Sequence, residues 1–438
     1  MGHAATVRKQ LNPSLTGHEA EQLERGLHKR IVGQDEAIEQ IINVYQAYLA
    51  RLNSPGRPIA NFLFLGPTGT GKTRVVEATA ESLLGDARAV IKIDCGEFQH
   101  SHEIAKLIGS PPGYLGHRET HPLLSQEVLN QCHTEQHKIS FVLFDEIEKA
   151  SDALWNLLLG ILDKANLTLG DNRRVDFSKS MIFMTSNLGA SEISNVMSPG
   201  LGFAGPRREE EDFRSEGMTS RIASAGMSAA RRKFTPEFIN RLDKVVVFKT
   251  LGEEELERIL DLELAQVHQR VLNGTPFLFQ LSKDARRHVM EEGTDPKYGA
   301  RHLKRAIERS LVYPMANLIA TEQIRVGDLV EIDFDPSRQE MAFERTDDRV
   351  TGLCHGAGRR HRHARGCRLG SRHGLDGIRG SQSGARKREQ VAQGAPGLPE
   401  RAHHGRRTGG YNHSKASKIR SAVLATYEIS FTAPTRMM

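Results

Sequence analysis

A glycine-rich segment at residues 66–73 has the residue types and spacing of a phosphate-binding loop. In such a loop the glycines let backbone N–H groups surround a β-phosphate, while a lysine neutralises β- and γ-phosphate charge. A strand-like apolar run leads into the segment and a helical pattern follows it, which favours this interpretation over a chance glycine-rich turn. We therefore expect ATP and Mg²⁺ to bind here. The loop consists of Gly66, Pro67, Thr68, Gly69, Thr70, Gly71, Lys72 and Thr73, which fits G-x-x-x-x-G-K-[ST].

Two acidic residues, Asp145 and Glu146, follow an apolar run at 139–144. Open α/β sheets bind ligands at the carboxyl ends of their strands, so this pair is expected beside the phosphate loop. Asp145 would hold Mg²⁺ together with Thr73, and Glu146 would orient and deprotonate the attacking water. An acidic pair that ends a strand is otherwise a solvated turn. The upstream phosphate loop argues against that alternative.

A parallel sheet is needed to hold these residues, and the apolar runs predict one. The runs are separated by stretches long enough for helices, as is typical of a doubly wound α/β fold. Residues 34–52 carry apolar side chains at three- and four-residue spacing, which predicts an amphipathic helix. The predicted strands lie at 62–65, 90–93, 139–144, 181–184 and 245–248.

Changes in composition along the chain predict four segments. Residues between Ser194 and Lys233 are rich in Gly, Pro and charge, as is typical of a surface loop. Ser282 is expected to cap a helix that ends near Gly293, and residues 329–334 read as a closing strand. The segments are an N-terminal segment (1–29), a large P-loop ATPase domain (30–250), a smaller, mainly helical domain (251–345) and a basic tail (346–438).

The net charge of +6 is unevenly distributed over the 438 residues. Residues 351–438 hold 17 of the 60 Lys and Arg but only 4 of the 54 Asp and Glu, a balance of +13 that leaves −7 for residues 1–350. Apolar residues in the tail recur with neither the two-residue period of a strand nor the 3.6-residue period of a helix. Its composition indicates disorder or sequence translated out of frame. The alternative is an Arg/Gly-rich tail that binds nucleic acid. No aromatic residues interleave the arginines from 359 to 407, which argues against it.

The remaining composition excludes several classes of protein. The four cysteines lack the spacing of a zinc site or a disulfide framework, which favours a reducing compartment. No apolar run approaches the ~18 residues of a spanning helix. The first residues also lack the apolar core of a signal peptide. We therefore expect a cytoplasmic protein without a membrane partner.

Seven motifs occur in one order along the chain, and together they resemble the second ATPase module of the Clp unfoldases, which are AAA+ proteins. The resemblance covers roughly residues 25–340. It implies a P-loop AAA+ fold with a smaller C-terminal domain, assembled as a homohexameric ring. The motifs are IVGQDEAI (31–38), GPTGTGKT (66–73), LIGSPPGYLG (107–116), FDEIEKA (144–150), MTSNLGA (184–190), FTPEFINRLD (234–243) and YGARHLKRAI (298–307).

The resemblance also implies roles for five residues around the nucleotide. Val32 and Gly33 match the segment whose backbone contacts adenine. Asn187 matches sensor 1, which positions the water and the γ-phosphate. Arg241 matches the arginine finger, which enters the neighbouring subunit's site, and Arg301 matches sensor 2. Without these motifs, each arginine would read as a surface charge.

Further matches concern the polypeptide that hydrolysis would move. By resemblance Tyr114 lies in the axial pore loop, which grips a threaded chain, and residues 167–177 match the second pore loop. Downstream of Tyr114 the sequence HRETHP stands where the family usually has a Gly-Gly pair. Leu201, Gly202 and Phe203 match the tripeptide with which some unfoldases dock on the ClpP peptidase. An apolar Phe203 in a hydrophilic loop supports docking over a passive loop.

The resemblance thus implies a single-ring, ATP-dependent protein unfoldase and translocase that feeds a ClpP-like peptidase and works with adaptor proteins. The chain has no peptidase triad of its own in recognisable context, and residues 1–29 are too short for a substrate-selecting domain. A ClpB-like disaggregase without peptidase is the alternative. A third reading is a non-catalytic scaffold or a nucleic-acid binder that uses the tail. The intact catalytic set argues against a scaffold, and the acidic balance of residues 1–350 argues against nucleic acid.

Overall fold

The computed structural model describes most of the chain up to residue 346. Tyr114, the tripeptide at 201–203 and the tail beyond residue 346 lie outside the described residues. The described ranges are 12–13, 15–110, 121–190, 192, 216–294 and 299–346. By its internal packing the chain forms two compact units. The first holds the described residues up to Arg270 with Leu281–Gln323 and Ile332–Phe343, and the second holds Val271–Gln280, Ile324–Glu331 and residues 344–346.

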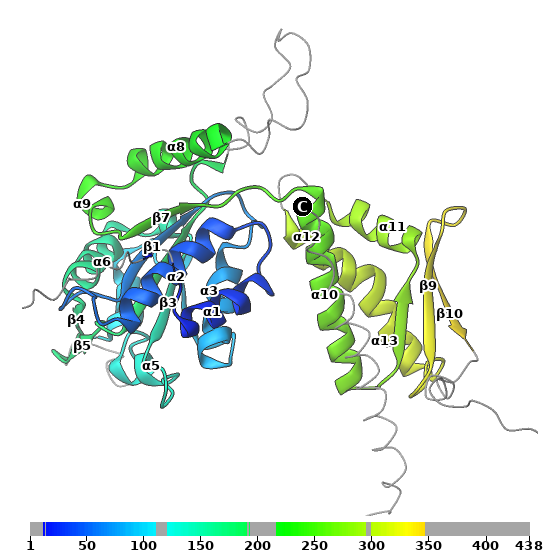
Figure 1. Ribbon diagram of the computed structural model, residues 1–438. Helices are drawn as coiled ribbons and strands as arrows, with labels where there is room; N and C mark the ends of the chain where they lie inside the picture. Colours follow the sequence, from blue (N-terminus) through cyan, green and yellow to red (C-terminus); the bar gives the residue numbers. More distant parts are fainter. Residues whose placement is uncertain are drawn as a thin grey trace, which may run out of the picture. The chain divides into compact units, whose positions relative to one another are not determined.

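A five-stranded parallel sheet lies at the centre of the first unit (Figure 1). Its order is β2-β3-β6-β1-β7, so β1 lies between β6 and β7, with Ala60 opposite Met181 and Phe62 opposite Lys244. The non-sequential order confirms the predicted doubly wound fold. The strands are β1 (Ala60–Leu65), β2 (Val90–Asp94), β3 (Ser140–Asp145), β6 (Ser180–Ser186) and β7 (Lys244–Val247).

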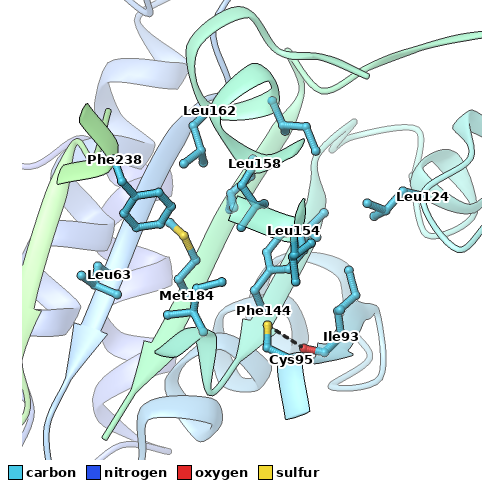
Figure 2. Close-up of a cluster of buried hydrophobic side chains, with 14 of the residues drawn as sticks. Leu63, Ile93, Cys95, Leu124, Phe144, Leu154, Leu158, Leu162, Met184 and Phe238 are labelled. Atoms are coloured by element: carbon cyan, nitrogen blue, oxygen red, sulfur yellow. Dashed lines mark hydrogen bonds between the residues drawn. The ribbon is translucent and has the colours of Figure 1, made fainter. Parts of the chain in front are cut away.

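Alternate residues of these strands face two separate cores, which is why the strands read as unbroken apolar runs. Phe62 and Phe64 of β1 pack against Phe183, and the Phe62 and Phe183 rings stack with centroids 5.0 Å apart. This core continues into α1 (His18–His28), α2 (Asp35–Leu49) and α3 (Lys72–Leu84). On the other face, α6 (Asp152–Lys164) covers the sheet (Figure 2). The second core includes Leu63, Phe144, Met184, Leu154, Leu158, Leu162 and Phe238.

Helix α8 (Glu216–Lys233) corrects the predicted loop between Ser194 and Lys233. Ile222, Ala229 and Ala230 are buried at helical spacing, so one side of α8 packs against the core. The Ser- and Ala-rich composition hid this weak apolar face. The short elements of this region are α4 (Ala105–Ile108), α5 (Gln126–Asn130), α9 (Pro236–Ile239), the hairpin strands β4 (Asn166–Thr168) and β5 (Arg174–Asp176), and the 3₁₀ turns η1 (Cys95–Glu97), η2 (Ser101–Ile104) and η3 (Ile147–Lys149).

The C-terminal elements are helices with one small sheet. Ser282 caps α11, because its Oγ accepts the N–H of Ala285 at 3.0 Å, as predicted. The sequence predicted strand β9 but not its neighbours β8 and β10, which are short or carry alternating charge. The helices are α10 (Glu253–Asn273), α11 (Lys283–Gly293), α12 (Ala300–Ile307) and α13 (Tyr313–Ala320), with a π-helical turn at Glu308–Val312. The strands β8 (Leu278–Leu281), β9 (Leu329–Asp335) and β10 (Glu340–Thr346) pair in the order β10-β9-β8.

Within the described ranges, no helix combines the length and the apolar character needed to cross a membrane.

Candidate functional site

The loop between β1 and α3 has a backbone that only glycine adopts readily. Gly66, Gly69 and Gly71 have φ values of 142°, 81° and 96°. A Cβ at Gly66 would lie 2.7 Å from the carbonyl oxygen of Phe248. The loop therefore curves tightly just before the N-terminus of α3, where backbone N–H groups and the helix dipole favour a phosphate.

Lys72 is buried in the first turn of α3, and its ammonium donates three hydrogen bonds. Nζ lies 2.7 Å from the Gly66 carbonyl oxygen, 2.8 Å from that of Pro67 and 3.0 Å from Oδ1 of Asn187. Burial lowers the pKa of Lys72 to about 8, although nearby carboxylates, Glu148 first, oppose that shift. The ammonium is thus held against the loop, with acidic groups close behind it.

The acidic pair ends β3, and Thr185 on the neighbouring β6 joins its two members. The Thr185 hydroxyl donates to Oδ1 of Asp145 and accepts the N–H of Glu146 at 3.1 Å. Glu146 has a left-handed backbone, with φ 56°. Its carboxylate pairs with Lys149, whose hydrogen bond is the main cause of the lowered pKa of Glu146. The carboxylate is therefore ionised at neutral pH, as a general base must be.

Asn187, the first residue after β6, connects the loop to the acidic pair. Its Oδ1 accepts hydrogen bonds from Lys72 and from Oγ1 of Thr68 at 3.3 Å, whereas its Nδ2 donates to Glu146 at 3.2 Å. The backbone N–H of Asn187 donates to Oε1 of Glu148 at 3.0 Å. One amide side chain therefore bridges the phosphate loop and the candidate general base.

Lys72, Asp145, Glu146 and Asn187 line one cavity of about 360 Å³, which has a charged part and an apolar part. Ala300, next to Arg301, donates its N–H to the carbonyl oxygen of Gly69 at 3.2 Å. The charged part suits phosphates and the apolar part suits a flat base. The charged part includes Lys72, Thr73, Asp145, Glu146, Asn187 and Arg301, and the apolar part includes Ile31, Val32, Leu251, Ile259 and Leu262.

Arg241 is not among the residues that line this cavity. Its guanidinium lies 2.9 Å from Oε1 of Glu237 and 3.9 Å from Oδ2 of Asp163. Gly33, Gly66, Pro67 and Thr68 also lie outside the lining set, although each adjoins a lining residue or contacts one. All other predicted nucleotide-site residues meet in the cavity, namely Val32, Gly69, Thr70, Gly71, Lys72, Thr73, Asp145, Glu146, Asn187 and Arg301.

Sequence reasoning missed three residues that hold this site together. Thr185 and Glu148 position the acidic pair and Asn187. Buried Gln34 donates to the carbonyl oxygens of Thr70 and Lys249, at 3.2 and 2.9 Å. Three weak signals were present, of which two are Thr185 directly after the apolar run of strand β6 and a third acidic residue in FDEIEKA. A polar residue directly after Gly33 was the signal for Gln34.

The donor atoms fit a Mg²⁺ ion that arrives with phosphates. Mg²⁺ prefers carboxylate and hydroxyl oxygens, uses one or two protein carboxylates and keeps several waters. Asp145 and Thr73 both line the cavity and supply such oxygens. The described residues hold no group of three or more His, Cys, Asp or Glu that could bind a metal alone. The oxygens of Asp145 and Thr73 therefore suit a Mg²⁺ ion that binds together with the nucleotide.

Two family models match the chain, an AAA domain (Cdc48 subfamily) over residues 57–245 and the C-terminal, D2-small domain of ClpB protein over 251–332. Chaperone protein ClpC2 of Arabidopsis thaliana chloroplasts is 38% identical over 335 residues, which are 76% of this chain and 33% of that protein. Chaperone protein ClpB of Gloeobacter violaceus is 38% identical over 316 residues, 72% of this chain and 34% of that protein. The chain belongs to the Clp family. It carries the second AAA+ module of that family.

A solved structure agrees with this assignment. The Clp module matches a closed-state cryo-EM reconstruction of Hsp104 with ATPyS and FITC casein, with a TM-score of 0.60 and 30% identity over 76% of this chain and 53% of that chain. The match confirms the P-loop AAA+ fold. The Clp module spans about a third of the length of the curated relatives that it matches.

Proposed function

We propose that the Clp module binds and hydrolyses ATP. The observation that carries this proposal is the Asn187 amide, which contacts Lys72 with its oxygen and Glu146 with its nitrogen inside one cavity. Lys72 and the backbone N–H groups of residues 69–73 would hold the β- and γ-phosphates. The apolar part of the cavity, which includes Val32, would hold the adenine.

Each side chain of the charged part then has a distinct task in hydrolysis. Glu146 orients the attacking water and accepts its proton on a carboxylate oxygen, while Asn187 fixes that carboxylate. Asp145 and Thr73 would hold Mg²⁺, which neutralises developing charge on the β- and γ-phosphates when it is bound. Arg301 would contact the γ-phosphate. None of these tasks requires a covalent intermediate on the protein.

We also propose that Arg241 acts on the nucleotide of a neighbouring subunit. Arg241 lies outside the nucleotide cavity of its own subunit, and its guanidinium pairs with Glu237 instead of Glu146 or Asp145. This position supports action in trans. An arginine finger contributes about 10³ or more in rate. An isolated subunit is therefore a poor ATPase, and the active form is a homohexameric ring.

The ATPase proposal is tested with the purified full chain. Hydrolysis per subunit should rise steeply with protein concentration and disappear in Glu146→Gln, which keeps the side-chain size but removes the base. Asp152→Asn, an equally conservative change at an exposed position on α6, is the matched control and should retain activity. Activity that survives in Glu146→Gln would refute the assigned site.

We propose that this hydrolysis drives the unfolding and translocation of polypeptides, which then enter a ClpP-like peptidase. A Staphylococcus saprophyticus relative, named ATP-dependent Clp protease ATP-binding subunit ClpC, supports this reading at 38% identity, with 36% of its length covered. The second candidate is a disaggregase without a peptidase. The match of residues 251–332 to the small domain of ClpB favours that alternative.

One experiment separates these two candidates. The full chain, ATP and an unstructured reporter protein are incubated with and without a ClpP-like peptidase. ATP-dependent degradation that is lost when residues 201–203 are deleted would establish docking through Leu201, Gly202 and Phe203. Reactivation of aggregates without the peptidase would instead support the disaggregase.

A further inference from the structure

Glu148 contacts Asn187 without lining the nucleotide cavity. Its Oε1 accepts the N–H of Asn187 at 3.0 Å, whereas its Oε2 is buried and has no hydrogen-bond partner among the described residues. A buried carboxylate oxygen without a partner is destabilising. A contribution to folding stability therefore does not explain why a glutamate occupies position 148.

The hydrogen bond from Asn187 to Glu148 fixes the chain where the sheet ends. The strand ladder pairs β6 with β1 as far as Ser186, so Asn187 is the first residue that the ladder no longer holds. Its N–H finds an acceptor on Glu148, and the next N–H, of Leu188, donates to Oγ of Ser186 at 3.1 Å. Side chains therefore define the backbone direction at Asn187.

That direction decides where the two ends of the Asn187 amide lie. The oxygen accepts from Lys72, and the nitrogen donates to Glu146, so the side chain must keep one orientation to serve both. Glu148 lies in the 3₁₀ turn η3 (Ile147–Lys149), which follows Glu146 directly. The candidate base Glu146 and the residue that accepts the N–H of Asn187 therefore lie only two positions apart in the chain.

We propose that Glu148 is a positioning residue for ATP hydrolysis, which holds the Asn187 amide between Lys72 and Glu146 through a hydrogen bond to the Asn187 backbone. The inference rests on the ATPase activity proposed above. Glu148 hydrogen-bonds Asn187 and does not line the cavity, although its charge also favours the protonated form of Lys72. Its loss should therefore slow the chemical step and change nucleotide binding at pH 7 only slightly.

Three variants of the full chain test this role: Glu148→Ala, Glu148→Gln and the exposed control Asp152→Asn. The alanine variant should lower kcat about tenfold to a hundredfold, as expected for a misplaced reacting group, and keep the Kd for a fluorescent ADP analogue within about twofold. The glutamine variant retains an acceptor oxygen, so its kcat should stay within about threefold of the wild-type value. The control should match the wild type in both measurements.

A double variant separates this role from a merely structural one. If Glu148 acts through Asn187, then Glu148→Ala in an Asn187→Ala background should cause little further loss of kcat. Should Glu148→Ala fail to fold, Glu148→Asp takes its place, because it keeps the charge and withdraws the carboxylate by one methylene. An unchanged kcat in the alanine and aspartate variants, or additive losses in the double variant, would overturn the inference. Absence of ATPase activity in the wild type would instead refute the proposed function.

Discussion

The site depends on a few polar side chains that each satisfy two partners. Thr185 hydrogen-bonds the carboxylate of Asp145 and the backbone N–H of Glu146. Asn187 hydrogen-bonds the side chains of Lys72 and Glu146. Such shared contacts fix the relative positions of a carboxylate pair, an amide and an ammonium before any ligand binds. Preorganised polar groups of this kind account for much of enzymatic rate enhancement.

Replacing Thr185 with valine tests that arrangement, because valine has the same shape and lacks the hydroxyl. The half-buried carboxylate of Asp145 and the N–H of Glu146 would lose their partner, which should destabilise the fold by about 1–3 kcal/mol and lower kcat about tenfold. Urea unfolding and steady-state ATPase assays measure the two effects. Thr185→Ser keeps the hydroxyl and should stay close to the wild type; equal losses in both variants would contradict the hydroxyl's role.

The lowered pKa of Lys72 predicts how nucleotide binding depends on pH. Burial brings this pKa from 10.5 to about 8, so the free protein loses the lysine charge as pH rises above about 8. The Kd for ADP, measured without Mg²⁺, should then increase by up to about tenfold per pH unit between pH 8 and 10. Lys72→Arg keeps its charge throughout this range and should show a flat profile. A flat wild-type profile would contradict the assigned cause.

The sheet was predictable because both of its faces are buried, whereas several flanking elements were not. Each strand that carries the site appears as an apolar run, and the residues that follow β1, β3 and β6 meet at one sheet edge. Helix α8 and strands β8 and β10 have weak apolar patterns. Thr185, Gln34 and Glu148 were missed because they bond to segments distant in sequence or to backbone groups. No local spacing records such contacts.

The hairpin of β4 and β5 packs against the segment that leads toward Tyr114. The N–H of Gly170 donates to the carbonyl oxygen of Ile108 at 2.8 Å, and a Cβ at Gly170 would lie 2.5 Å from the carbonyl oxygen of Gly109. The second predicted pore segment thus lies beside the start of the first. Only glycine permits this approach.

Gly170→Ala should therefore displace the hairpin from residues 108–109. Because the hairpin contributes no residue to the nucleotide cavity, basal ATPase activity should stay within about twofold, while ATP-dependent unfolding of a reporter should fall about tenfold or more. Gly160→Ala on α6 is the control, since its Cβ would meet only one atom, at 3.8 Å. Equal loss of both activities in Gly170→Ala would show that the contact supports the fold rather than substrate movement.

At the scale of the whole molecule, the charge separates the Clp module from its tail. Residues 1–350 carry −7 and residues 351–438 carry +13, so the average of +6 describes neither part. The acidic part contains every residue assigned to the nucleotide. Arg241 also lies outside the cavity of its own chain and pairs with Glu237. This position supports our proposal that the ring, rather than the single chain, is the unit of activity.

Mixing two inactive variants tests this central claim most directly. Glu146→Gln lacks the base but keeps the finger, and Arg241→Ala lacks the finger but keeps the base. If the finger acts in trans, each variant alone is inactive, and an equal mixture recovers up to about a quarter of the wild-type ATPase rate through mixed neighbours. A mixture that stays inactive while the wild type hydrolyses ATP, or an Arg241→Ala variant with full activity alone, would contradict the account.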